Sequence, residues 1–322
     1  MNDEPKILFS PLWQDVLEED QFYRKQPLLA HYTSIEVLER ILCNDEIWLS
    51  NPLFMNDLEE VSFGIDNSEP LILANSLIAS VLKTPERRLR FNAEYSREVS
   101  LFRGDHVFDT YVFCMSEHPK KDDDSDGILS MWRGYGGNGS GAAVVFDASK
   151  INLVHSSAFM IAKVVYATGP ERGAWIDKTI EQFCEILKQS ALPDEKLSIA
   201  AAMLFERIKI FALFSKHRGF RQEAEWRAVY WKSRDTAGAL KPYLDYFIGG
   251  GRVEPKLKLK IRPIEGVTAD DFSLEKIVHQ IIIGPCISSN MTMRVLQRLL
   301  EKAGKTGLIP RLRTSRIPFR NT

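Results

Sequence analysis

The sequence predicts an α+β protein, in which short strands are interspersed with helices. Several short segments alternate apolar with polar side chains, as strands do. Two longer stretches, at about 70–103 and 173–217, repeat apolar residues at helical spacing. No apolar run approaches the roughly 20 residues that a membrane-spanning helix needs. We therefore expect one α+β domain over residues 1–322, with these helical stretches inserted into it.

Composition sets broad limits on the function. The 322 residues are 44% hydrophobic and 26% charged, with a formal net charge of -1, so we expect no general attraction to nucleic acid or anionic lipid. The four scattered cysteines argue against a zinc site and a disulfide framework. The acidic, polar N-terminus does not resemble a signal peptide. These features predict a cytoplasmic protein without a membrane segment or a metal.

The first elements are a strand, a helix and a second strand. Residues 28–33 form the expected strand, and Thr33 with Glu36 fits a capping box that begins a helix through Leu42. Residues 47–50 read as a short strand that Pro52 ends. The acidic turn at 54–60 follows.

The middle of the chain alternates helices with strands. Pro85 is expected to divide the helical stretch at 70–103. The glycine-rich run 134–141 predicts a hinge rather than a phosphate-binding loop, because its helix precedes the glycines. The other elements expected up to the last third are strands at 109–116, 142–147 and 160–166, a short helix at 128–135, and helices at 173–190 and 195–217.

Residues 222–231 carry the most distinctive charge pattern. In a strand, Glu223, Glu225 and Arg227 would share one face, and Trp226 would lie on the other. Carboxylates held on a strand can line a cleft, although a solvated edge strand explains the same pattern. The elements expected after it are strands at 256–261, 277–284 and 310–320, and a helix from Ser288 or Ser289 to about Leu300.

Several short motifs together resemble a bacterial family known only as domain of unknown function 2971. The resemblance covers residues 28–287 and implies no established activity. The motifs are His31-Tyr32-Thr33, Ile47-Trp48-Leu49-Ser50, Phe54-Met55-Asn56-Asp57-Leu58-Glu59, Phe113-Cys114-Met115-Ser116, Met131-Trp132-Arg133-Gly134-Tyr135, Glu223-Ala224-Glu225-Trp226-Arg227 and Ile282-Ile283-Gly284-Pro285.

A more distant resemblance carries an activity. The strand with His31 and Thr33, its helix, the short strand ending at Ser50 and the late Glu-x-Glu strand are similar to the layout of ADP-ribosyltransferases, in particular the DNA-modifying toxins. This resemblance implies a split mixed or antiparallel sheet with an inserted helical lobe, and NAD as co-substrate. It implies Glu225 as the catalytic carboxylate, supported by Glu223, and His31 at a ribose hydroxyl. Thr33 or Ser50 would shape the nicotinamide pocket.

The chemistry of NAD explains the need for such residues. Breaking the nicotinamide–ribose bond develops positive charge on the ribose, which a carboxylate stabilises. An aromatic ring can hold the cationic nicotinamide, and an arginine suits the pyrophosphate. No single arginine matches that clamp, and Arg133, Arg221 and Arg227 are the candidates. The predicted cofactor-binding residues are His31, Tyr32, Thr33, Ser50, Asn56, Trp132, Arg133, Tyr135 and Arg227, with no metal.

Structural explanations exist for the same residues. His31 can be a strand histidine bonded to backbone, Thr33 a helix cap, and Trp132 with Tyr135 a core pair. Arg227 can form an ion pair with Glu223 or Glu225.

Three functions compete at this point. The first is an NAD-consuming ADP-ribosyltransferase or NAD glycohydrolase, with a nucleic acid or protein acceptor, in bacterial defence or as a toxin. The second is a Mg²⁺-dependent nuclease or hydrolase built from Asp57, Glu59, Glu223 and Glu225. The third is an inactive ligand-binding or sensor module. The arginine-rich tail could add a basic patch at Arg311, Arg313, Arg316 and Arg320.

Overall fold

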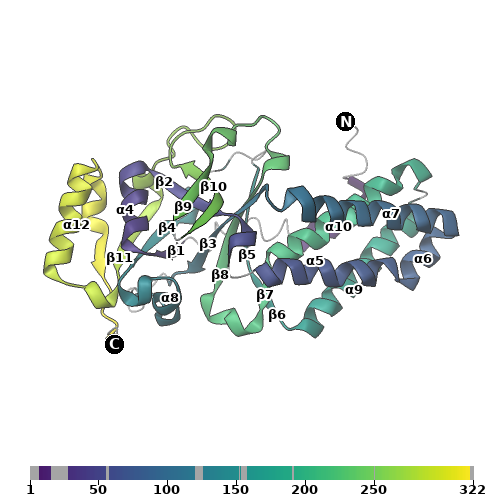
Figure 1. Ribbon diagram of the computed structural model, residues 1–322, viewed down its shortest axis with the longest axis horizontal. Helices are drawn as coiled ribbons and strands as arrows, with labels where there is room; N and C mark the ends of the chain where they lie inside the picture. The colour runs from purple at the N-terminus through teal and green to yellow at the C-terminus, as the bar shows by residue number, and fades with distance from the viewer. Residues whose placement is uncertain are drawn as a thin grey trace. The chain divides into compact units, whose positions relative to one another are not determined.

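The computed structural model describes residues 7–15, 28–55, 58–119, 126–151, 153, 158–190, 192–249 and 251–319 (Figure 1). The chain divides into two compact units. The helical unit comprises Met1–Asp20, Asn51–Thr110 and Val164–Phe220, and the sheet unit comprises Gln21–Ser50, Tyr111–Lys163 and Arg221–Thr322. Both predicted helical insertions fall in the helical unit.

The helical unit packs its helices around an aromatic core. Pro85 stands at the start of a helix that Thr84 caps, so it divides the 70–103 stretch as predicted. Phe91, Tyr95 and Phe183 are fully buried, and the ring of Phe91 packs against those of both Tyr95 and Phe183. The elements are α5 (Leu58–Leu73), α6 (Ser76–Leu82), α7 (Pro85–Leu101), α9 (Gly169–Gln189), α10 (Leu197–Leu213), and the parallel strands β6 (Val165–Ala167) and β7 (Ser215–His217).

The sheet unit is built on a mixed, mostly antiparallel sheet, which together with the helices confirms the α+β class. Among the described residues the sheet has ten strands, in the order β12-β11-β4-β1-β3-β2-β10-β9, with β8 pairing with β3 and β5 pairing with β8. The strands are β1 (Leu28–Thr33), β2 (Glu46–Ser50), β3 (Thr110–Glu117), β4 (Ala142–Asp147), β5 (Phe159–Lys163), β8 (Glu225–Trp231), β9 (Leu244–Gly249), β10 (Arg252–Lys260), β11 (Val278–Ile283) and β12 (Leu312–Thr314). The helices are α4 (Ile35–Asn44), α8 (Leu129–Gly134), α11 (Leu274–Ile277) and α12 (Asn290–Lys302).

The two faces of this sheet carry different residues. One face holds the main core, to which Leu29 of β1, Phe113 of β3 and Trp226 of β8 belong. The opposite face, here called the second face, holds a smaller core around Tyr32 and Trp132. Because side chains alternate between the two faces along a strand, a residue directly before or after a main-core residue in the same strand lies on the second face.

Strand β3 has three partners, and this creates a fork in the sheet. Glu117 N donates to Ala224 O and the Tyr111 ring lies 6.2 Å from that of Tyr230, so β8 runs antiparallel along the whole of one edge of β3. Strands β1 and β2 must therefore share the other edge. The pairs Ala30 with Ser116 and Ser50 with Val112 show β1 at one end and β2 at the other.

Helix α4 joins the two strands of the fork. Its N-cap is Ser34, whose Oγ accepts from Val37 N, so the prediction of Thr33 as cap is wrong by one residue. Thr33 remains extended as the last residue of β1, because it still pairs with Ala142. Leu38 and Leu42 bury α4 in the main core, so the helix covers the fork on that face.

The end of the glycine-rich run is closely packed, which does not match a hinge at that point. A Cβ on Gly141 would lie 2.1 Å from Thr33 O and 2.7 Å from Gly136 O. Thr33 O is at the end of β1, and Gly136 O accepts from Gly141 N, so moving either atom disturbs local backbone structure. We expect Gly141→Ala to lower the free energy of unfolding by about 1–3 kcal/mol.

Urea unfolding of the variant, measured beside Gly134→Ala, tests this prediction. A Cβ on Gly134 meets nothing within 4 Å, so that control should retain its stability. Equal stability of both variants would contradict the packing argument.

Candidate functional site

Polar side chains gather on the second face where β1, β3 and β8 lie side by side. The register places Ala30 opposite Ser116 and, through the antiparallel β3–β8 pair, Glu225 beside Ser116. All three lie on the second face, since their neighbours belong to the main core. Glu225 is 4% exposed and Ser116 is fully buried. A carboxylate and a hydroxyl are thus held on adjacent rigid strands.

Glu225 and Arg227 form a buried ion pair. Arg227 Nε lies 2.8 Å from Glu225 Oε1, and one terminal nitrogen lies 3.2 Å from Oε2. Their i, i+2 spacing on β8 puts both on one face, as predicted, and Arg227 is 2% exposed. The sequence predicted an ion pair of Arg227 with Glu223 or Glu225, and in the structure Arg227 pairs with Glu225. The pair brings the predicted catalytic acid and a predicted cofactor-binding cation together.

Glu223 is separated from this strand. Ala224 has φ 42°, in the left-handed region, so the backbone turns before β8 begins. The expected strand start at residue 222 is therefore wrong, and Glu223 ends a 3-10 helix. Its Oε1 accepts from the Tyr135 hydroxyl at 2.9 Å. This contact brings Glu223 and Tyr135 together from distant parts of the sequence.

His31 occupies the fork itself. Its Nδ1 lies 2.9 Å from the carbonyl oxygen of Cys114, a residue of β3 between the positions that pair with β1 and with β2. A carbonyl only accepts, so Nδ1 carries the hydrogen and Nε2 keeps its lone pair. Burial lowers the pKa of His31, more than the Cys114 bond raises it, which favours the neutral ring. Its ring packs 4.3 Å from that of Phe113, and His31 pairs with Val144, so it lies on the main-core face, opposite to the face that holds Glu225.

The predicted aromatic wall is only partly exposed. Trp132 is fully buried, and its ring meets Tyr32 edge-on at 5.0 Å. The Tyr32 hydroxyl accepts from Ile128 N, and burial raises the pKa of Tyr32 to about 12. Both rings thus belong to the second core and offer no free face to a ligand. Tyr135, at 40% exposure, is the most exposed ring of this predicted set.

The remaining predicted residues are spread around the fork. Ser50 ends β2 and accepts from Lys256 Nζ at 2.8 Å, and Lys256 also pairs with Glu254 at 2.9 Å. Arg133 is exposed and lies over the Phe319 ring, with 5.1 Å between Cζ and the ring centre. Asn56 lies outside the described residues.

Sequence reasoning missed Ser116 and Lys256. The Ser116 hydroxyl is buried and has no hydrogen-bond partner among the described residues. Lys256 is 9% exposed although it lies on a strand whose lysines were expected to be half-exposed. Only the pairing of β3 with β8 and of β2 with β10 brings these side chains to the site, and neither pairing is local in sequence.

His118 makes stability depend on pH. It is 1% exposed, and burial, with a smaller effect of His279, lowers its pKa to about 4. The unfolded chain, with a pKa near 6.5, therefore takes up a proton before the folded protein does. Stability is full above about pH 6.5 and falls as the pH drops toward 4, by up to about 3 kcal/mol for this residue.

Unfolding in urea at several pH values tests this dependence. His118→Gln should flatten the loss between pH 6.5 and 4, whereas the exposed His106→Gln should not. An unchanged slope for His118→Gln would show that other groups cause the acid sensitivity.

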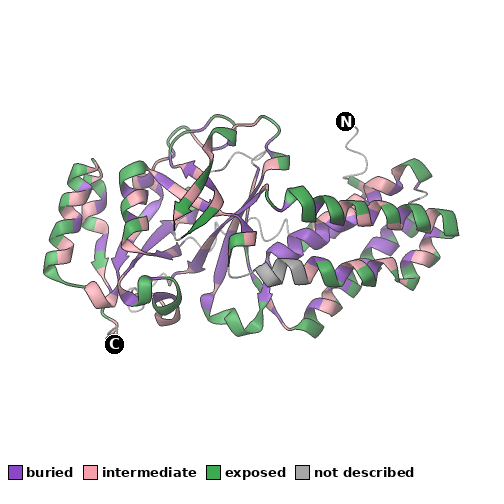
Figure 2. Cartoon of the chain, viewed as in Figure 1, coloured by how far each residue is buried: buried purple, intermediate pink, exposed green. Residues whose placement is uncertain are grey.

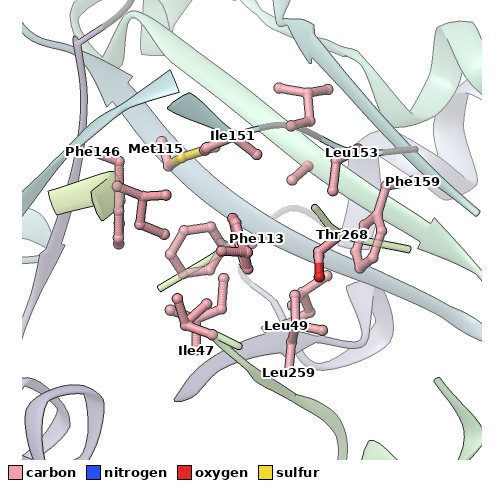
Figure 3. Close-up of a pocket in the computed structure, with 15 residues that line it drawn as sticks. Ile47, Leu49, Phe113, Met115, Phe146, Ile151, Leu153, Phe159, Leu259 and Thr268 are labelled. Carbon is pink, nitrogen blue, oxygen red and sulfur yellow. The ribbon is translucent and has the colours of Figure 1, made fainter. Parts of the chain in front are cut away.

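The described residues contain an apolar pocket but no cluster suited to a metal ion. Within the described ranges, no three His, Cys, Asp or Glu side chains come together to hold a metal ion. Asp57 lies outside those ranges, and the Glu59 side chain is not described. The sheet unit has a pocket in its main core, lined by apolar side chains such as Phe113, with the Thr268 hydroxyl as a polar group (Figure 3). That hydroxyl bonds to Ile264 N and Arg262 O, so the pocket has no group placed for catalysis.

Comparison with known proteins bears on the same strands. Residues 131–228 match the family model described as protein of unknown function (DUF2971). The matched region runs from α8 into β8 and includes Trp132, Tyr135, Glu223 and Glu225. It supports part of the resemblance expected over residues 28–287. No curated protein and no solved structure matches the chain. Over the described part of the chain, no helix is both long and apolar enough to cross a membrane.

Proposed function

We propose that the sheet unit cleaves the nicotinamide–ribose bond of NAD on its second face, beside Glu225, as an ADP-ribosyltransferase or NAD glycohydrolase. The observation that carries the proposal is the buried Glu225 carboxylate, held at the start of β8 on the second face beside Ser116 and bonded to Arg227. His31 lies two strand spacings from β8, about 10 Å, and on the opposite face of the sheet, so the proposed site is built on Glu225. The resemblance to ADP-ribosyltransferases implies a split sheet and a strand that bears Glu-x-Glu, of which Glu225 lies on a strand here and Glu223 does not.

Each residue has a role that its surroundings support. The Glu225 carboxylate, held on a strand and away from water, stabilises positive charge that develops on the ribose. Tyr135 provides an exposed ring near Glu223. Arg227 can leave Glu225 for the pyrophosphate, which requires the ion pair to open on binding.

Release of nicotinamide from NAD by the purified chain tests this proposal. We expect release that requires no added metal and increases when the natural acceptor is present. Protein and nucleic acid extracts serve as acceptor sources. No release in buffer, with Mg²⁺ or with either extract would contradict the proposal.

The Glu225–Arg227 pair specifically favours a second candidate, a module that binds a nucleotide without turnover. A carboxylate already neutralised by a buried arginine suits binding better than catalysis. Saturable binding of NAD in calorimetry, with no nicotinamide released, would support this candidate over the first.

A further inference from the structure

The cations near the C-terminus differ in what they contact. Arg311 donates to the carbonyl oxygen of Glu275, Arg313 to that of Pro310, and Arg316 pairs with Asp126 at 3.2 Å. These tail arginines, expected to form a basic patch, are therefore engaged in holding the fold. Arg320 lies outside the described residues.

Helix α12 carries a different set of cations, here called the basic row: Arg294, Arg298 and Lys302. All three are exposed, and none makes a hydrogen bond or ion pair with any residue that the structure describes. The spacing of i, i+4 and i+8 places them along one side of the helix. At 1.5 Å per residue, the row extends over about 12 Å. The helix has a single acidic residue, Glu301.

The opposite side of α12 is already occupied. Leu296 and Leu300 are buried in the main core, while exposed residues recur along the helix (Figure 2). Met291 and Val295, 77% and 61% exposed, are the large apolar side chains beside the basic row. A helix that inserts into a membrane interface needs a broad free apolar face, which α12 lacks. Charge therefore dominates its outward surface.

We infer that the basic row binds the phosphate backbone of a nucleic acid. One strand of a duplex carries a phosphate every 3.4 Å or so along its axis, so a 12 Å row faces about four phosphates. Three unpaired cations on a chain whose net charge is -1 concentrate positive charge at one place. Binding of this kind depends on charge and salt rather than on base sequence. The inference does not depend on NAD chemistry.

Binding of a labelled duplex and a labelled single strand to the full chain tests the inference across 50–200 mM salt. If three phosphates are neutralised, log K should fall against log salt with a slope near -2.7 for the duplex and near -2 for the single strand. Affinity should thus drop about 40-fold and 20-fold over that range. Each cation removed should reduce the slope by about 1.

A matched control separates the row from general charge. The variant Arg294→Gln/Arg298→Gln/Lys302→Gln should lose the salt-dependent binding. The variant Arg90→Gln/Lys178→Gln/Arg252→Gln removes the same number of exposed cations elsewhere and should retain it. Equal losses in both variants, or wild-type protein that binds anionic vesicles but neither nucleic acid, would overturn the inference. Thermal unfolding of each variant confirms that it is folded.

Discussion

Glu225→Gln should lower the rate of nicotinamide release by about 10²–10³-fold, if release occurs as proposed. Glutamine keeps the size of the side chain and one acceptor oxygen but removes the negative charge. The lost charge is the part that stabilises a developing ribose cation. The measurement is the initial rate of nicotinamide release from NAD by wild type and variant at equal concentration.

Controls must separate chemistry from folding, since the substitution also leaves Arg227 without its carboxylate. Glu225→Gln/Arg227→Met removes both charges and should fold well, because a buried ion pair can be replaced without loss of stability. We expect this folded double variant to be as inactive as the single one. Glu223→Gln, which alters the acid bonded to Tyr135, should have a smaller effect. Full activity in the double variant would exclude Glu225 as the catalytic group.

Arg227→Ala should destabilise the sheet unit by about 3–5 kcal/mol. The substitution removes one partner of a buried pair and leaves the Glu225 carboxylate, which is 4% exposed, without this cation. The cost comes mainly from the uncompensated charge rather than from the lost attraction. Urea unfolding at pH 7.5 gives the change in free energy.

Two comparisons give this result its meaning. Arg133→Ala, at an exposed arginine that lies over Phe319, should cost less than about 1 kcal/mol. Combining Arg227→Ala with Glu225→Gln should recover part of the lost stability, because the buried charge of Glu225 is removed as well. An Arg227→Ala variant as stable as Arg133→Ala would show that Glu225 is well solvated after all.

The elements of the fold could be predicted more fully than the site. Apolar periodicity indicated most helices and strands, whereas boundaries depended on local hydrogen bonds. Ser34 rather than Thr33 caps α4, and the capping box of Thr168 with Glu171 starts α9 before the expected residue 173. Strand β9 was not predicted, since its apolar residues Tyr246 and Ile248 are exposed.

The site depended on contacts between distant segments. The pairing of Glu225 with Arg227 follows from two-residue spacing and was among the possibilities foreseen. The branching at β3 has no signal in the sequence, because it arises when three strands from distant parts of the chain meet on β3. The left-handed Ala224, which takes Glu223 off the strand, has no signal in the sequence, since alanine rarely adopts that conformation. Trp132 and Tyr135 are three residues apart, which predicts that they share one helix face. Their spacing does not show that Trp132 is buried and Tyr135 exposed.

The two ring nitrogens of His31 have different roles: Nδ1 bonds to the backbone of β3, and Nε2 is the nitrogen that changes with pH. Nδ1 donates to the Cys114 carbonyl whether the ring is neutral or protonated, so acid leaves this link across the fork in place. Protonation instead converts Nε2 from an acceptor into a donor. Because burial lowers the pKa of His31, this reversal needs a pH below the usual range for histidine. At neutral pH, Nε2 would accept from the hydroxyl of a ligand, whereas in acid it would donate to an oxygen acceptor. The bond between Nδ1 and Cys114 would be the same in both cases.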